Sequence, residues 1–185
     1  MKIIIGAGKT TLDGWIATQQ NDLDLLSRED FLKQFTPNSI EAMLAEHVWE
    51  HMTPEEGILA AKHCYEFLQN GGYIRCAVPD INFRNEQYQI MVQVGGPGPV
   101  DHPAYTHNFV YDYISLVSVF ENAGFEVEIL EYCDKNGVFH YKYWNEADGR
   151  IGRSFRFDTR NNMQQLGMVS IIWDAKKPLI IFPVE

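Results

Sequence analysis

The sequence predicts an α/β fold with a largely parallel sheet. Strand-like and helix-like segments alternate over most of the chain, and a strand-rich stretch with an Asn136-Gly137 turn follows in the last third. Such alternation favours a parallel sheet, because each crossover helix returns the chain to the same end of the sheet. The chain has 185 residues, 45% of them apolar, so it can bury one core and is not a disordered chain. Because the sequence shows no internal repeat and no linker that would divide it, we expect residues 1–185 to form one domain.

Three candidate strands and a short helix come first. Residues 3–5 are a β-branched run that stops at Gly6-Ala7-Gly8, which is typical of a buried strand followed by a tight turn. Residues 15–18 form a second possible strand. Ser27 fits the N-cap of a short helix. Residues 39–45 are a third possible strand, although their composition alone does not exclude a helix.

The clearest helix begins at Thr53-Pro54, where the threonine is a suitable cap and the proline occupies the first helical position. Glu56 completes a capping box, and apolar residues follow at helical spacing. We expect the Gly71-Gly72 pair to end this helix with a left-handed C-cap. Residues 73–78 then have the composition of a strand.

The second half of the chain contains one more clear helix and several strand-like segments. The elements expected there are a polar segment at 81–94 that is compatible with a helix, a loop at 95–99, a helix at 110–122, strands at 125–132 and 138–144 around a hairpin turn, an irregular stretch at 150–162, and a strand at 168–173.

Charge and composition exclude several classes of protein. The net charge of −10 disfavours a nucleic-acid-binding protein, since phosphate contacts need Lys and Arg. The three cysteines are too few and too scattered for a disulfide framework or a four-thiolate zinc site. No apolar run approaches the length of a membrane span, and the start lacks the pattern of a signal peptide. We therefore expect a cytoplasmic protein with reduced thiols.

Residues 6–11 superficially match a nucleotide phosphate loop. That loop needs a glycine five positions before the Gly-Lys glycine, so that enough backbone amides surround the phosphate. Here Ile3 occupies that position, and the next residues indicate a turn into another strand rather than a helix. The loop is too short to enclose a phosphate.

His47, Glu50 and His51 match the His-x-x-Glu-His pattern of one class of zinc peptidases. On a helix, the two histidines would share a face and could hold zinc while the glutamate polarised a water molecule. No downstream acid stands out as a third ligand. A zinc-dependent hydrolase therefore remains an alternative, and we assign no metal ligand.

Six segments follow one another at the spacing of a known family. They are 3–8, 12–16, 22–26, 43–52, 69–74 with 78–80 after it, and 122–125. Together they resemble a compact class I S-adenosylmethionine-dependent methyltransferase. The Glu46-His47-x-x-Glu50-His51 segment is the most specific of them. The tail segments 152–154, 158–161 and 175–178 also resemble one subgroup of small predicted methyltransferases.

This resemblance implies a Rossmann-like, doubly wound, mostly parallel seven-stranded sheet with an antiparallel C-terminal hairpin. It places the cofactor, S-adenosylmethionine, at the carboxyl ends of the strands near the topological switch point. Gly6 and Gly8 would bring the backbone close to the cofactor, which a side chain would obstruct. The cofactor-binding residues implied are Gly6, Ala7, Gly8, Thr18, Gln19, Asp24, Leu25, Glu46 and His47.

Two departures from the family stand out. Family members commonly carry an acid after the second strand that accepts from both ribose hydroxyls, whereas Gln19 occupies that neighbourhood here. Asp22 and Asp24 are the nearby acids that would compensate for it. We also expect the N-terminal helices that often cover the site to be lacking, because the first strand is predicted at the start of the given sequence. Segments 81–108 and 133–165 are the expected substrate-side or inserted parts, and the site is closed by 81–108, by a second subunit in a homodimer, or not at all.

The expected reaction is methyl transfer to an unidentified small-molecule acceptor. The resemblance points to His51, Asp80, Tyr105 and His107 on the acceptor side, with His107 preferred as a base because a histidine pKa lies near working pH. Arg153 and Arg160 either bind an anionic acceptor or pair with Asp148 and Asp158. A methyltransferase-like fold that serves as a non-catalytic binding or assembly module is a further alternative, prompted by Gln19 and the missing helices.

Overall fold

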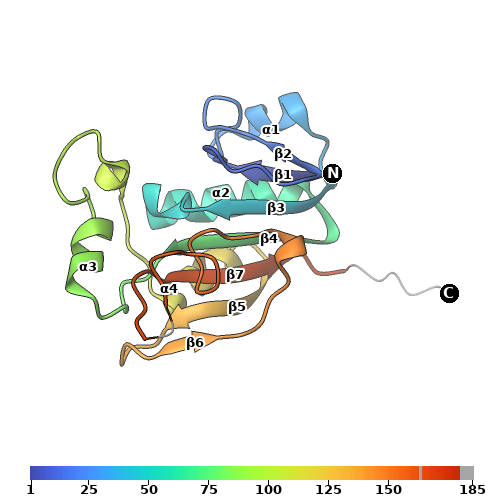
Figure 1. The fold of residues 1–185 in the computed structure, drawn as a ribbon. Helices are drawn as coiled ribbons and strands as arrows, with labels where there is room; N and C mark the ends of the chain where they lie inside the picture. The colour runs from blue at the N-terminus through green and yellow to red at the C-terminus, as the bar shows by residue number, and fades with distance from the viewer. Residues whose placement is uncertain (163, 180–185) are drawn as a thin grey trace.

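One mixed sheet forms the centre of the computed structural model, which describes residues 1–162 and 164–179. Within these residues the strands lie in the order β2 (Trp15–Ala17), β1 (Lys2–Ile5), β3 (Ile40–Glu46), β4 (Leu68–Pro79), β7 (Ser170–Lys176), β5 (Glu126–Cys133) and β6 (Phe139–Tyr141) (Figure 1). The pairs β1–β2, β1–β3 and β3–β4 are parallel, whereas β7 is antiparallel to β4 and β5, and β6 is antiparallel to β5. The expected α/β fold, with its seven-stranded, mostly parallel sheet and antiparallel hairpin, is confirmed.

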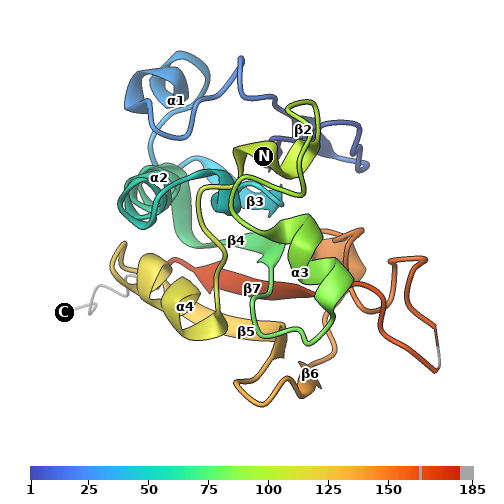
Figure 2. The same cartoon turned by 90° about the vertical axis from the view of Figure 1, so that its left-hand side faces the viewer.

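Three helices cover one face of the sheet. They are α1 (Arg28–Gln34), α2 (Pro54–Phe67) and α4 (Tyr113–Glu121), which lie together on one side of the strands (Figure 2). Their apolar side chains enclose a large core with strand residues such as Met43 and Ala45. A fourth helix, α3 (Glu86–Val92), lies beyond the end of the sheet where β3 and β4 finish (Figure 1). Short 3-10 turns complete the structure at Trp49–His51, Pro103–Thr106 and Glu146–Asp148.

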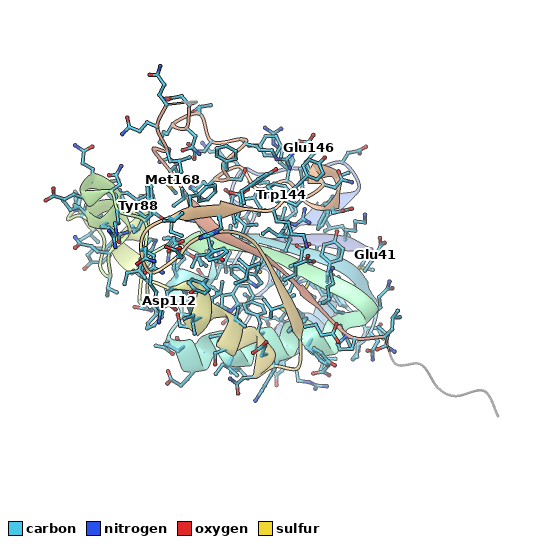
Figure 3. The ribbon with its side chains drawn as sticks, turned by 90° about the horizontal axis from the view of Figure 1, so that it is seen from below. Glu41, Tyr88, Asp112, Trp144, Glu146 and Met168 are labelled. Carbon is cyan, nitrogen blue, oxygen red and sulfur yellow. The ribbon has the colours of Figure 1, made fainter. Side chains whose placement is uncertain are left out.

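An irregular stretch, rather than a layer of helices, covers the other face of the sheet. Trp144, Ile151 and Phe157 pack there against strand residues such as Leu44 and Ile172. Figure 3 shows Trp144 on the side of the sheet opposite α2 and α4. The sheet is therefore buried on both faces, which explains why β3 reads as an almost continuous apolar run.

Several local predictions are confirmed by the caps. The Ser27 side chain accepts from the Asp30 N–H at the start of α1. Thr53 and Glu56 form both halves of the capping box that begins α2. The stretch 150–162 contains no helix or strand, as expected, and the glycine turn after β1 leads to β2 without an intervening helix.

The predicted glycine C-cap of α2 is wrong. The helix ends at Phe67, and β4 begins at Leu68, which is fully buried and pairs with Ile40 of β3. Gly71, with a φ of 76°, instead allows a bend inside β4, where the register against β3 shifts. Burial of Leu68 in the sheet therefore ends the helix before the glycines are reached.

The bounds of one more helix and one strand also differ from those expected from the sequence. The second long helix starts at Tyr113 rather than 110, because the Asp112 carboxylate caps the Ser115 N–H. The strand expected at 138–144 ends at Tyr141, since the chain then turns so that Trp144 can enter the second core. No helix among the described residues is both long and apolar enough to cross a lipid bilayer.

Candidate functional site

The chain reverses the direction of strand addition at β1, because β2 lies on one side of it and β3 on the other. Ligands of open α/β sheets bind at such switch points, beyond the carboxyl ends of the strands. A cavity of about 970 Å³ lies at this point, within the size range of small-molecule sites. Its lining combines the ends of β1 and β3 with 6–10, 50–51, parts of α3, 102–104, 107, 152–153, 160, 165, 167 and 168.

Gly6, Ala7 and Gly8 line the cavity, as expected of the glycine turn. Gly6 and Gly8 have φ values of 58° and 54°, which favour glycine. A Cβ on Gly6 would lie 3.0 Å from Val48 Cγ2, whereas a Cβ on Gly8 would meet no atom within 4 Å. Gly8 therefore leaves open space over its backbone on the cavity wall.

Thr18 and Gln19 hold this turn in place and do not line the cavity. The Thr18 hydroxyl donates to the Ile4 carbonyl at 3.0 Å. Gln19 Oε1 accepts from the Gly8 N–H at 3.1 Å, while its Nε2 donates to the Gly8 carbonyl at 3.0 Å. Both halves of the Gln19 amide are thus used by the protein itself.

Asp24 and Leu25 also lie outside the cavity lining. Asp24 Oδ1 accepts from the Leu26 N–H at 2.9 Å, which stabilises the turn before α1. Leu25 is buried in the main core beside the helices. Their positions are explained by the local turn and by apolar packing.

Glu46 ends β3 and faces the cavity. Its two carboxylate oxygens accept from the backbone N–H groups of Gly152 and Arg153 at 2.9 and 2.7 Å. The carboxylate therefore fastens the irregular stretch to the end of β3, so that 152–153 become part of the cavity wall. Charge-assisted bonds of this kind are stronger than neutral ones.

The His47–His51 segment does not form the helix that the zinc-hydrolase alternative requires. β3 stops at Glu46, His47 has a left-handed φ of 57°, and only a 3-10 turn at 49–51 follows. The His47 ring lies between Ser170 Oγ, 3.1 Å from its Nε2, and Glu50 Oε1, 3.0 Å from its Nδ1. His47 and His51 consequently do not share a helical face, so the zinc-peptidase arrangement considered as an alternative is not formed.

Glu50 is fully buried at the cavity wall, beside His47. Burial acts to raise the pKa of its carboxyl, but the proximity of His47 outweighs this effect and leaves that pKa below its ordinary value. Among the described residues, neither of its carboxylate oxygens has a hydrogen-bond partner. A charged carboxylate is thus held at the wall with unused acceptor capacity.

His51 and His107 meet Glu50 at the cavity wall, and their ring centroids are 5.0 Å apart. The His107 Nδ1 lies 2.8 Å from the Val92 carbonyl, to which it must donate. His107 Nε2 lies 4.0 Å from Glu50 Oε1. Burial lowers the pKa of His107, so a neutral imidazole with a free Nε2 lone pair is favoured there.

Asp80 and Tyr105, the other acceptor-side candidates, do not line the cavity. The Asp80 carboxylate accepts from the backbone N–H groups of Asn82 and Cys133 at 2.8 and 2.6 Å, which ties the end of β4 to β5. Burial raises the pKa of Asp80 to about 6. Tyr105 is exposed on the 3-10 turn at 103–106.

Arg153 and Arg160 both line the cavity. Arg160 forms a two-point ion pair with Asp158, at 2.8 and 2.6 Å. Arg153 Nη1 lies 3.9 Å from Glu46 Oε1, rather than near Asp148 as the sequence allowed. Arg153 is therefore the less tightly paired of the two cations at the wall.

No protein-family model matches the sequence, and no curated protein resembles it at a significant level. Several solved structures, however, resemble this chain in fold. A SAM-dependent methyltransferase from Archaeoglobus fulgidus aligns over 95% of this chain and 85% of its own, with a TM-score of 0.54 and 16% identity. One from Methanosarcina mazei aligns over 97% and 92%, with a TM-score of 0.53 and 11% identity. The chain has the class I methyltransferase fold.

A third methyltransferase structure, from Thermotoga maritima and described as a possible histamine N-methyltransferase, aligns over 95% of this chain and 81% of its own, with a TM-score of 0.50 and 14% identity.

The sequence did not indicate the cavity residues from α3 or those at 165, 167 and 168. For α3, the one signal was the interpretation of 81–108 as a substrate-side segment, and the residues at 165, 167 and 168 had no signal of their own in the sequence.

Proposed function

We propose that the protein binds S-adenosylmethionine in the switch-point cavity and transfers its methyl group to a small-molecule acceptor. The observation that carries this proposal is the glycine turn of a methyltransferase fold lining a cavity at the ends of β1 and β3. Gly8 supports it, because its exposed backbone leaves room for a ligand to contact the turn directly.

The bound sulfonium supplies the reactivity, because methyl transfer is an in-line displacement in which the S–CH₃ bond breaks as the bond to the acceptor forms. The protein's part is to align the acceptor and to exclude water. The stretch held by Glu46 and the turn at 102–104 wall the cavity and would serve both purposes. When the acceptor is a hydroxyl, the proposed base is His107 Nε2, because the other ring nitrogen is engaged by the Val92 carbonyl.

Isothermal titration calorimetry with S-adenosylmethionine and with its demethylated product tests the proposal. We expect saturable binding of both by the wild-type protein and loss of binding in Gly8→Asp, whose carboxylate would occupy the open space and repel the ligand's own carboxylate. Gly14→Asp is a matched control, since Gly14 also has a positive φ and open space at Cβ but lies outside the lining. Absence of binding at millimolar ligand, or equal losses in both variants, would contradict the proposal.

One observation favours a non-catalytic binding module as a second candidate. The Gln19 amide, at the position where the family places a ribose-binding acid, is engaged on both sides by Gly8. In a module of this kind, neither the wild-type chain nor a Gln19→Asp variant would bind S-adenosylmethionine. Binding by the wild-type protein, followed by transfer of a labelled methyl group to any acceptor, excludes that candidate.

A further inference from the structure

Glu50, His51 and His107 bring three metal-binding groups to one point on the cavity wall. One ligand atom from each lies within 4.8 Å of the other two. Glu50 and His51 come from the turn after β3, whereas His107 follows the 3-10 turn at 103–106, more than fifty residues later. The methyltransferase fold, rather than a local motif, therefore assembles the cluster.

His47 lies beside the Glu50 carboxylate, yet the carboxylate oxygens keep acceptor capacity that a cation could use. Glu50 is fully buried, and neither of its oxygens has a hydrogen-bond partner among residues 1–162 and 164–179, although His47 Nδ1 lies 3.0 Å from Oε1. A buried charge without hydrogen bonds is costly, so such groups are usually paired or bound to a metal. His47 Nδ1 contacts Oε1, the same oxygen that His107 Nε2 approaches at 4.0 Å, and the His47 ring is itself fixed by Ser170.

A contact at Nδ1 orients each of the two histidine rings. His107 donates from Nδ1 to the Val92 carbonyl, which directs its Nε2 lone pair toward Glu50. His51 Nδ1 lies 2.8 Å from Thr106 Oγ1. Metal-binding histidines typically have such outer contacts, which fix the tautomer and the ring orientation. The 4.0 Å between His107 Nε2 and Glu50 Oε1 needs to contract only slightly to reach the roughly 3.4 Å between ligands of a four-coordinate ion.

We propose that Glu50, His51 and His107 bind a divalent transition-metal ion such as Zn²⁺ at the wall of the cavity. Two imidazoles and one carboxylate are a ligand set that suits zinc and other first-row ions with an open coordination position. All three residues line the cavity, so the open position faces the space where a small molecule would bind.

Given the proposed methyl transfer, on which this step rests, the site also defines a class of acceptor. A metal-bound hydroxyl loses its proton to solvent more readily than a free one, and its oxygen then attacks the methyl carbon as the S–CH₃ bond breaks. His107 would act as a ligand in that case, and the metal would replace it as the group that activates the acceptor. Acceptors with a hydroxyl able to coordinate the ion are therefore expected.

Metal binding is tested on the full chain without S-adenosylmethionine. After removal of metals with a chelator, Co²⁺ is titrated as a visible-absorbing probe, and Zn²⁺ is then used to displace it. We expect one equivalent of Co²⁺ to bind with an intensified absorption band that Zn²⁺ abolishes, and either ion to raise the thermal midpoint. Glu50→Gln and His107→Asn should each weaken binding at least tenfold, a change on the order of that seen when outer contacts of metal ligands are lost.

The two variants are chosen to keep the fold. Asn at 107 retains a donor for the Val92 carbonyl, and Gln at 50 removes only a buried charge. His140→Asn is the matched control, because His140 forms an exposed pair with Asp134 at 3.0 Å outside the cavity. The proposal is overturned if Co²⁺ produces no absorption band, or if the control weakens binding as much as the two cavity variants.

The same measurements separate this proposal from the proposed function. If the protein binds metal but does not bind S-adenosylmethionine, the metal site is supported and the proposed methyl transfer is contradicted. Binding of S-adenosylmethionine without any metal binding would have the opposite consequence.

Discussion

Arg75 fastens the irregular stretch to the second face of the sheet. Its side chain is 2% exposed and forms a two-point ion pair with Asp174 of β7, at 2.7 and 2.9 Å. Its remaining nitrogen donates to the carbonyls of Asn145 and Gly149, at 2.8 and 3.0 Å. One side chain therefore joins two strands to the segment that covers them.

Arg75→Met removes all four of these bonds while keeping most of the apolar volume. The Asp174 carboxylate, which is 8% exposed, is then left buried without its partner. Breaking a buried ion pair in this way costs about 3–5 kcal/mol in the free energy of unfolding. For a chain of this size each kcal/mol lowers the thermal midpoint by about 2–4 °C, so a fall of roughly 6–20 °C is expected.

Urea unfolding followed by circular dichroism measures the loss. We expect a lower midpoint with an unchanged m-value, because the surface exposed on unfolding is nearly the same. The double variant Arg75→Met/Asp174→Leu should recover at least half of the loss, since no uncompensated charge remains. Arg28→Met is the control: its pair with Glu66 at 2.6 Å is exposed, and water and salt screen it.

This account of the second face is refuted if Arg75→Met destabilises the protein no more than Arg28→Met does. It is also refuted if the double variant is no more stable than Arg75→Met alone, because the cost would then not arise from an unpaired carboxylate.

Three further outcomes are expected. Glu46→Gln should lose one of the two hydrogen bonds to backbone N–H groups and lower the free energy of unfolding by about 1.5–3 kcal/mol. Amide hydrogen exchange at 150–153 should become faster, and unchanged exchange would contradict this role of Glu46. Burial raises the pKa of Asp80 from 3.8 to about 6, so the folded state binds the proton more tightly than the unfolded state. This carboxyl should therefore lower stability by up to about 3 kcal/mol as pH rises from 4 to 7, and Asp80→Asn should remove that contribution from the slope measured in urea titrations. Gln19→Ala should loosen the glycine turn, seen as faster exchange of the Gly8 amide while that of Gly14 stays unchanged.

Much of the fold could be predicted because its signals are local. The β-branched run before Gly6, the Ser27 and Thr53 caps and the Asn136-Gly137 turn each specify an element through contacts between residues close in sequence. The glycine turn was expected at a strand end, and it lines the cavity because the carboxyl ends of parallel strands meet at one edge.

The remaining features depend on residues far apart in the chain. The insertion of β7 between β4 and β5, the cover of the second face by Trp144, and the approach of His107 to Glu50 all follow from packing. Gln19 shows the same limit, because only the folded turn reveals that Gly8 occupies both ends of its amide. The sequence by itself determined most of the elements, their order and the glycine turn, since these depend on local propensity and on hydrogen bonds between residues close in sequence. The tertiary structure alone decided which side chains meet at the cavity, because distant segments are brought together by burial of apolar surface, which no local pattern specifies.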